Sequence, residues 1–91
     1  MQRYLKVRVG EGEMRIGRRN HLWLCPIALA VMRLMPDAVG IRVNVLGLIE
    51  IAKRDRTVAR YQTPDDVRRW IAAWDSQRDV EPIEFWIGVI E

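Results

Sequence analysis

Eleven consecutive residues without charge, 22–32 (LWLCPIALAVM), lie within a 91-residue chain of which 30% is Asp, Glu, Lys or Arg. A membrane-spanning helix needs about 20 apolar residues, and this run ends sooner, at Arg33. A segment this apolar is also costly to expose to water. We therefore expect residues 22–32 to be the buried centre of one soluble domain, which leaves recognition to charged loops and a sheet surface.

The length and the cysteine content narrow the class of protein further. A chain of 91 residues has room for one domain, 1–91, because compact domains contain about 100–150 residues. Its single cysteine, Cys25, excludes an intrachain disulfide, which is typical of a reducing compartment. The first nine residues alternate polar and apolar and lack the apolar region of a signal peptide. We expect a cytoplasmic protein with no membrane partner.

The net charge of +3 hides a division along the chain. Residues 1–60 contain twelve Lys and Arg against five Asp and Glu, whereas residues 61–91 contain three Arg against seven acidic residues. The two parts therefore carry +7 and −4. Such a division either attracts an anionic partner to one face or lets the two parts of the chain attract each other.

Strands are predicted where apolar and polar residues alternate, because successive side chains of a strand point to opposite faces of the sheet. The alternating segments are residues 3–9, 39–45 and 83–89, and the turns expected at 46–47 and 53–56 place two further strands at 48–52 and 57–62. Residues 10–12 (GEG) supply a turn, so residues 13–16 are expected to fold back as a short additional strand. Residues 46–47 and 53–56 are expected to be turns in a meander of two or three antiparallel strands.

The first helix is expected to begin at Pro26 with Cys25 as its N-cap. Proline in a helix interior costs about 3 kcal/mol, but at the first position its missing N–H costs nothing. Residues 21–24 then form an extended lead-in, and Pro36 ends the helix. Because residues 28–30 make the opposite side apolar as well, the helix is expected to be buried nearly all round. The side chains expected to share one face are Ile27, Val31 and Leu34.

The second helix has the clearest local signals. Thr63 is expected to be its N-cap and Pro64 its first residue, with Asp65 and Asp66 in the first turn, where the helix dipole favours anions. One apolar stripe is expected to face the core, and it consists of Val67, Trp70, Ile71 and Trp74.

These elements predict an α+β fold. The simplest arrangement is a two-layer sandwich, in which a mostly antiparallel sheet of four to five strands carries two helices on one face. The last strand follows a helix, so it either pairs in parallel with an inner strand or lies at an edge.

His21 and Cys25 suggest a general base and a nucleophile, because a cysteine at a helix N-terminus has a stabilised thiolate. No third residue that would orient the base is evident, and cysteine is among the most buried residue types, so a structural Cys25 is favoured. Two such residues are also too few for a structural zinc site, which needs four ligands. We expect no catalytic residue, no metal and no cofactor.

Basic residues cluster in two predicted loops and suggest a phosphate-binding surface if both loops lie at the same end of the sheet. Tyr4, beside Lys6 and Arg8 on the first strand, would add a stacking partner. The alternative is a solvated surface, which is favoured because no groove-reading motif is present. The candidates are Arg15, Arg18, Arg19, Lys53, Arg54, Arg56 and Arg60.

Trp86 and Glu84 are predicted to lie on the side of the last strand that faces away from the core. Tryptophan is enriched at the energetic centres of protein interfaces, so Trp86 is a candidate contact residue. An equally favoured alternative is that Trp86 covers part of the second face of a small sheet. A homodimer through an edge strand or through Trp86 is compatible with either interpretation.

Three patterns resemble a set of small phage and prophage proteins: N-x4-C-P-I-A-x-A at residues 20–30, T-P-x2-V-x2-W-I-x2-W-D at residues 63–75, and V-x-P-I-x-F at residues 80–85. The resemblance covers roughly residues 20–87, and its motifs are capping, core and strand patterns that carry no active site. It implies a phage-encoded accessory factor in the host cytoplasm, of a kind that includes anti-CRISPR and other anti-defence proteins.

The leading hypothesis is a non-enzymatic binding protein that occludes a host protein or ribonucleoprotein complex. The first alternative is a small nucleic-acid-binding regulator that uses the basic loops. The second alternative is a thiol enzyme that uses Cys25.

Overall fold

The computed structural model describes residues 4–21, 23–44 and 46–89, so the predictions made for Arg3, Leu22 and Val45 lie outside the described residues. Five strands form one sheet in the order β1-β5-β4-β3-β2, with antiparallel pairing throughout. The α+β fold with an antiparallel sheet is therefore confirmed, although the described residues contain three helices rather than two. Along the chain the elements are β1 (Tyr4–Val9), α1 (Glu11–Ile16), α2 (Pro26–Leu34), β2 (Ala38–Val43), β3 (Leu48–Lys53), β4 (Val58–Gln62), α3 (Asp65–Asp75) and β5 (Ile83–Val89).

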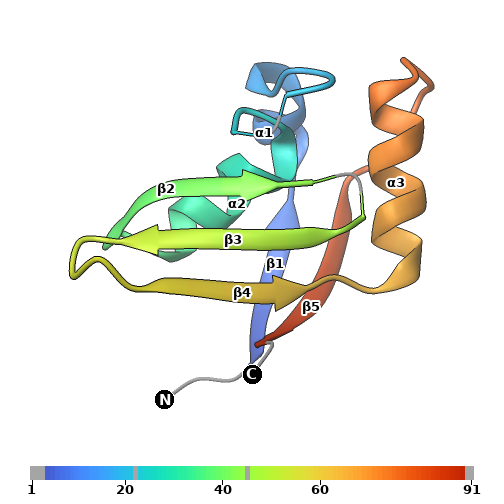
Figure 1. Ribbon diagram of the computed structural model, residues 1–91. Helices are drawn as coiled ribbons and strands as arrows, with labels where there is room; N and C mark the ends of the chain where they lie inside the picture. The colour runs from blue at the N-terminus through green and yellow to red at the C-terminus, as the bar shows by residue number, and fades with distance from the viewer. Residues whose placement is uncertain (1–3, 22, 45, 90–91) are drawn as a thin grey trace.

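The sheet curls around its core. Figure 1 shows β2, β3 and β4 crossing in front of β1 and β5 at a steep angle. Strands β4 and β5 are paired at two positions, Tyr61↔Val89 and Gln62↔Gly88, and this short junction allows the sheet to bend. Helix α2 contacts both edge strands, β1 and β2, and so closes the concave side. Apolar side chains from all five strands, α2 and α3 form one buried cluster inside.

Residues 11–16 form a helix, α1, and the prediction of a strand at residues 13–16 is wrong. The deciding residue is Glu13, whose carboxylate accepts a hydrogen bond from the Gly10 N–H at 2.8 Å, as the glutamate of a capping box does. Arg15 in the last turn complements the negative end of the helix dipole. At Gly17, which ends α1, an added Cβ would lie 2.7 Å from Cγ of Pro26, so α1 packs directly on the start of α2.

Helix α2 begins at Pro26 with Cys25 as its N-cap, as predicted. The Cys25 sulfur accepts a hydrogen bond from the Ala28 N–H at 3.5 Å. The lead-in differs from the prediction, because residues 23 and 24 lie in a turn rather than an extended segment. His21 stabilises this turn, since its Nδ1 accepts the N–H groups of residues 23 and 24 at 3.3 and 3.0 Å.

The expectation that residues 22–32 are buried throughout is wrong at both ends of the segment. Residues 25–28, 30 and 31 are buried, whereas Trp23, Leu24 and Met32 are exposed. Leu34, expected on the core face, is exposed as well. A short helix can press one side against a curled sheet, and its other side then faces α1 or solvent.

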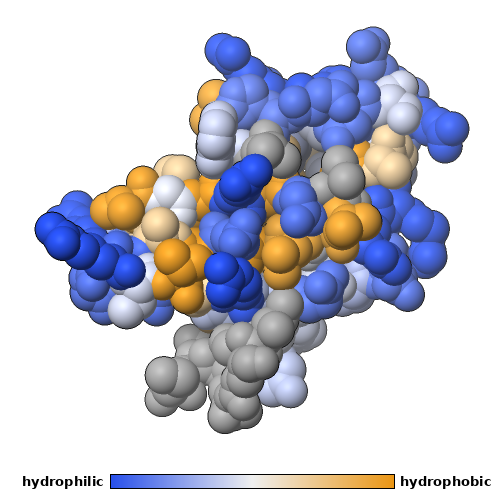
Figure 2. Space-filling model, viewed as in Figure 1, coloured by the Kyte–Doolittle hydropathy of each residue, from blue (hydrophilic) through white to orange (hydrophobic). Residues whose placement is uncertain are grey.

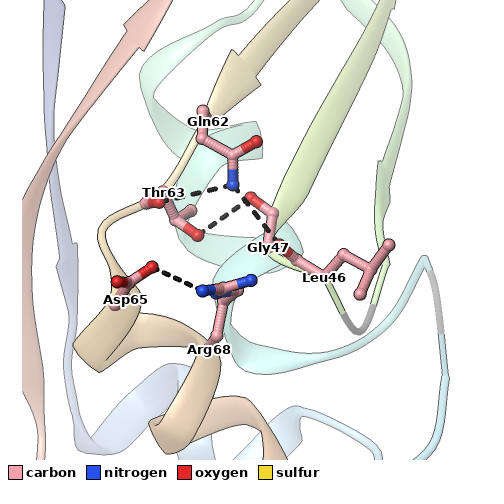
Figure 3. A network of polar contacts seen from close by, with 6 residues as sticks. All are labelled: Leu46, Gly47, Gln62, Thr63, Asp65 and Arg68. Atoms are coloured by element: carbon pink, nitrogen blue, oxygen red, sulfur yellow. Dashed lines mark hydrogen bonds and ion pairs between the residues drawn. The ribbon is translucent and has the colours of Figure 1, made fainter.

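Helix α3 buries the predicted stripe of Val67, Trp70, Ile71 and Trp74, but Thr63 does not cap it. The Thr63 hydroxyl donates to the Gly47 carbonyl at 2.8 Å (Figure 3). The Thr63 N–H donates to the same carbonyl at 3.1 Å. Gly47 forms the β2–β3 turn with φ +81°, and an added Cβ would lie 2.2 Å from Oγ1 of Thr63. Thr63 therefore ties this turn to the start of α3, and Pro64 occupies the N-cap position instead.

Strand β5 lies inside the sheet, between β1 and β4, and is antiparallel to both. Both sequence alternatives, parallel pairing and an edge position, are wrong. After α3 ends at Asp75, the connecting segment leads into β5, which pairs with the whole length of β1. Trp70 anchors this connection, because its indole N–H donates to the Glu81 carbonyl at 2.8 Å.

Candidate functional site

The helical layer presents large apolar side chains to solvent. Ile16, at the end of α1, is 73% exposed, and Met32, on the outer side of α2, is 44% exposed. Trp23 and Leu24 in the connecting loop and Leu34 at the end of α2 are exposed as well. Of these side chains, Ile16 and Met32 line one hollow, and neighbouring exposed apolar side chains on a small protein are typical of an interaction site.

Between α1 and α2 lies a hollow of 250 Å³ that is lined by Ile16, Leu29 and Met32 together with Glu13 and Arg33. We call it the apolar hollow. Its walls are aliphatic, and methionine adapts its flexible side chain to different partners. The apolar hollow is therefore suited to receive an apolar side chain of another molecule.

A second hollow, of 510 Å³, shares Glu13 and Arg33 with the first and extends to strand β1. Lys6 and Arg8 of β1 line it, together with Leu34 of α2. We call it the basic hollow. Three cationic side chains, Lys6, Arg8 and Arg33, surround this space, so its walls favour an anionic ligand.

The ion pair of Glu13 with Arg33 forms a wall common to both hollows. Glu13 is buried, and its carboxylate accepts hydrogen bonds from the Gly10 N–H and from the Arg33 guanidinium. The bond from Gly10, followed by the bond and charge of Arg33, holds the pKa of Glu13 below its ordinary value, although burial opposes this. Glu13 thereby fixes α1 against α2 and sets the shape of both hollows.

The loop that carries Trp23 is fastened to the end of α3. The Asn20 N–H donates to the Asp75 carboxylate at 2.8 Å, and the Asn20 side-chain amide donates to the Asp75 carbonyl at 3.2 Å. Asn20 has φ 55°, a left-handed conformation that asparagine tolerates better than most residues. These contacts join the segment at residues 20–30 to the segment at residues 63–75.

The outer face of β1 and β5 carries the predicted candidates Trp86 and Glu84, which point away from the core as expected. The Glu84 carboxylate lies 2.7 Å from Nζ of Lys6 and 2.8 Å from Nε of Arg8. Hydrogen bonds from Lys6 and then Arg8 hold the pKa of Glu84 below its ordinary value. The Lys6 ammonium also lies 5.9 Å from the centre of the Trp86 ring, and Tyr4 is exposed on the same face.

The two basic loops do not come together. Arg18 and Arg19 lie beside α3, where the Arg18 carbonyl accepts the Trp74 indole N–H at 3.3 Å and the Arg19 guanidinium lies 4.1 Å from a Trp74 ring centre. Figure 1 shows the β3–β4 turn, with Arg54 and Arg56, at the other extremity of the molecule. Arg15 lies on α1, and Lys53 ends β3.

The outer face of β2–β4 is mixed in polarity rather than uniformly basic. Arg42, Glu50 and Arg60 form a row across the three strands, and Glu50 accepts a bond from Arg60 at 3.1 Å. Figure 2 shows polar and apolar side chains side by side on this face. Arg60 is thus engaged within the sheet, at a distance from the basic hollow.

Cys25 and His21 both line a small hollow of 140 Å³ next to Asp75. Burial raises the pKa of the Cys25 thiol, and the negative charge of Asp75 adds to the shift. The Nδ1 atom of His21 already accepts two backbone N–H groups. The arrangement favours a protonated thiol that caps α2 over a thiolate nucleophile.

Across the described ranges, 4–21, 23–44 and 46–89, no group of three or more His, Cys, Asp or Glu is placed to hold a metal ion. Within that same part of the chain, each helix is too short or too polar to cross a membrane. No protein-family model, curated protein or solved structure matches the chain.

Sequence reasoning missed Glu13, Ile16, Met32 and Arg33 as site residues. One signal was available, because a short helix that is apolar on all sides cannot bury every side in a domain of this size. The apolar residues at positions 29, 32 and 34 therefore required a cover. Helix α1 lies against α2 but leaves Met32 and Leu34 exposed, and Leu29 and Met32 line the apolar hollow.

Proposed function

We propose that the protein is a non-enzymatic accessory factor of phage type that binds a host macromolecular machine, such as a defence complex, and occludes it. The observation that carries the proposal is the exposed apolar surface of α1 and α2, with Ile16 and Met32 beside the apolar hollow. Aliphatic side chains and a guanidinium group provide contact area and hydrogen bonds, which are what a binding surface requires.

The magnitudes are compatible with specific binding. Burying a Met or Ile side chain contributes about 1.5–3 kcal/mol. Ile16 and Met32 are partly exposed already in the free protein and would anchor the centre of an interface of about 800 Å² on each partner. Arg33 lies beside them. Arginine is one of the residue types that are enriched at protein interfaces.

The test uses tagged protein, a lysate of the host cell, and two variants of similar chemistry. Ile16→Glu with Met32→Glu places charge in the apolar hollow, and Val58→Glu places charge on an exposed valine of β4 far from it. We expect wild type and the Val58 variant to retain one stoichiometric partner and to inhibit its activity.

The double variant is expected to lose both the partner and the inhibition while keeping a native circular dichroism spectrum. Retention of the same partner by a folded double variant would contradict this docking surface. Repeated failure of folded wild type to recover any partner would remove the proposal.

A further inference from the structure

Two exposed aromatic residues, Tyr4 and Trp86, occupy diagonal positions on the outer face of β1 and β5. Tyr4 is opposite Gly88, and Trp86 is opposite Lys6, so the two aromatic residues are diagonal neighbours about 7–8 Å apart. Tyr4 is 63% exposed and Trp86 is 57% exposed. An added Cβ at Gly88 would lie 3.2 Å from Cε1 of Tyr4, so the Tyr4 ring lies over backbone without a side chain. We call Tyr4 and Trp86 together the aromatic platform.

Cationic side chains border this platform on the side of β1. The Lys6 ammonium lies 5.9 Å from the Trp86 ring centre, and Arg8 follows two residues later on the same face. Both line the basic hollow, whose opposite wall carries Arg33. Lys6 and Arg8 pair with Glu84, and Arg33 pairs with Glu13. Three positive charges against two negative charges leave this surface with a net positive charge.

We propose that this surface binds single-stranded nucleic acid, with bases stacked on Tyr4 and Trp86 and phosphates beside Lys6, Arg8 and Arg33. Base stacking on aromatic side chains next to a basic groove is the usual physical basis of single-strand binding. Duplex bases are already stacked and cannot use the rings. On β1, Trp86 has Lys6 opposite it, with Tyr4 and Arg8 as diagonal neighbours, so its ring is bordered by two cations and a second aromatic residue. The site is separate from the apolar hollow and does not depend on the proposed docking.

The experiment measures the fluorescence anisotropy of a labelled oligothymidine or oligouridine of about 15 nucleotides, which is within the range of single-strand site sizes. Three phosphate contacts predict a slope of about −2 for log affinity against log salt, so affinity falls about fifteen-fold between 50 and 200 mM salt. Binding should also quench tryptophan fluorescence, because a base stacks on the exposed Trp86 ring.

Two variants remove the rings but keep apolar side chains, Tyr4→Leu and Trp86→Leu. Each is expected to weaken binding about ten-fold or more, and Trp86→Leu should abolish the quenching. Val39→Leu is the control, because Val39 is an exposed residue of β2, at the opposite edge of the sheet, and it should leave affinity and quenching unchanged. Circular dichroism spectra confirm that each variant is folded.

Three results would overturn the proposal. The first is the absence of an anisotropy change at 50 mM salt with folded wild type. The second is undiminished binding by both ring variants, and the third is equally tight binding of a duplex of the same length. If Trp86→Leu instead abolished capture of a protein partner while no oligonucleotide bound, the face would be a protein contact. The double variant of Ile16 and Met32 alters the apolar hollow and leaves Tyr4 and Trp86 unchanged. Its capture of a partner therefore tests the proposed docking, whereas the ring variants test the binding of nucleic acid.

Discussion

Replacing Glu13 with alanine removes the capping bond at the start of α1 and the ion pair that joins α1 to Arg33 of α2. The carboxylate accepts the Gly10 N–H at 2.8 Å and pairs with Arg33. Loss of a helix cap costs about 1 kcal/mol. The ion pair adds about 0.5 kcal/mol, because the Arg33 side chain is 73% exposed and water screens it. We therefore expect Glu13→Ala to lower the free energy of unfolding by about 1.5 kcal/mol, which is about 6–12 °C in Tm for a domain of this size.

The measurement is equilibrium unfolding in urea, followed by tryptophan fluorescence and by circular dichroism. Glu11→Ala is the control, because Glu11 is an exposed glutamate in the same helix. It is expected to change the free energy by less than about 0.5 kcal/mol. A Glu13→Ala variant as stable as wild type would refute the role assigned to this carboxylate, as would equal effects of the two substitutions.

The contribution of Glu13 to the free energy of unfolding should change with pH in one definite direction. Because folding lowers the pKa of Glu13, its contribution is present above the unfolded value, about 4.3, and is lost as the pH falls through the folded value. The gap in stability between wild type and Glu13→Gln should therefore be full at pH 7 and shrink below about pH 4. A gap that widened on acidification would contradict the sign of the shift.

Three further predictions follow from single contacts. Gly47→Ala should destabilise the fold by at least about 2 kcal/mol in urea unfolding, since φ is +81° and the new Cβ meets Thr63; wild-type stability would contradict the turn geometry. Asn20→Ala should cost about 1 kcal/mol and Asn20→Gly less, because glycine keeps the left-handed backbone; the reverse order would be inconsistent with φ 55°. Alkylation of native Cys25 at pH 7, followed by mass spectrometry, should be much slower than that of the unfolded chain, because burial raises its pKa; equal rates would restore the thiol-enzyme hypothesis.

Local patterns were enough to predict most elements. Alternation located β1, β2 and β5, because their residues face a core on one side and water on the other, and the flanking turns located β3 and β4. All five agree with the prediction to within one or two residues. Proline at the first helical position located α2, and the spacing of Val67, Trp70, Ile71 and Trp74 located α3 and its buried side.

The failures occurred where a long-range contact overrode a local signal. Thr63 resembles an N-cap in sequence, but the Gly47 carbonyl, which comes from a turn 16 residues earlier, takes its hydroxyl. Helix α1 was missed because Gly10 and Gly12 suggest a hairpin, whereas the side chain of Glu13 caps a helix there. The position of β5 inside the sheet depends on pairing with β1 at the other end of the sequence, which no local pattern specifies.

The candidate site was only partly accessible to sequence reasoning. Exposure of Trp86 and Glu84 followed from the strand period, because alternate residues of β5 face outward. The apolar hollow did not follow, because it depends on how α1 lies on α2 and therefore on the unpredicted helix. The separation of the two basic loops likewise required the curl of the sheet (Figure 1).

The central claim, that the protein acts by docking through the α1–α2 surface, is tested most directly by photo-crosslinking in host lysate. A photoreactive amino acid replaces Met32 in one sample and Val58 in a second, since both positions are exposed and lie on different surfaces. The account predicts one discrete crosslinked partner from position 32 and none from position 58. No adduct from position 32, or the same adducts from both positions, would contradict it.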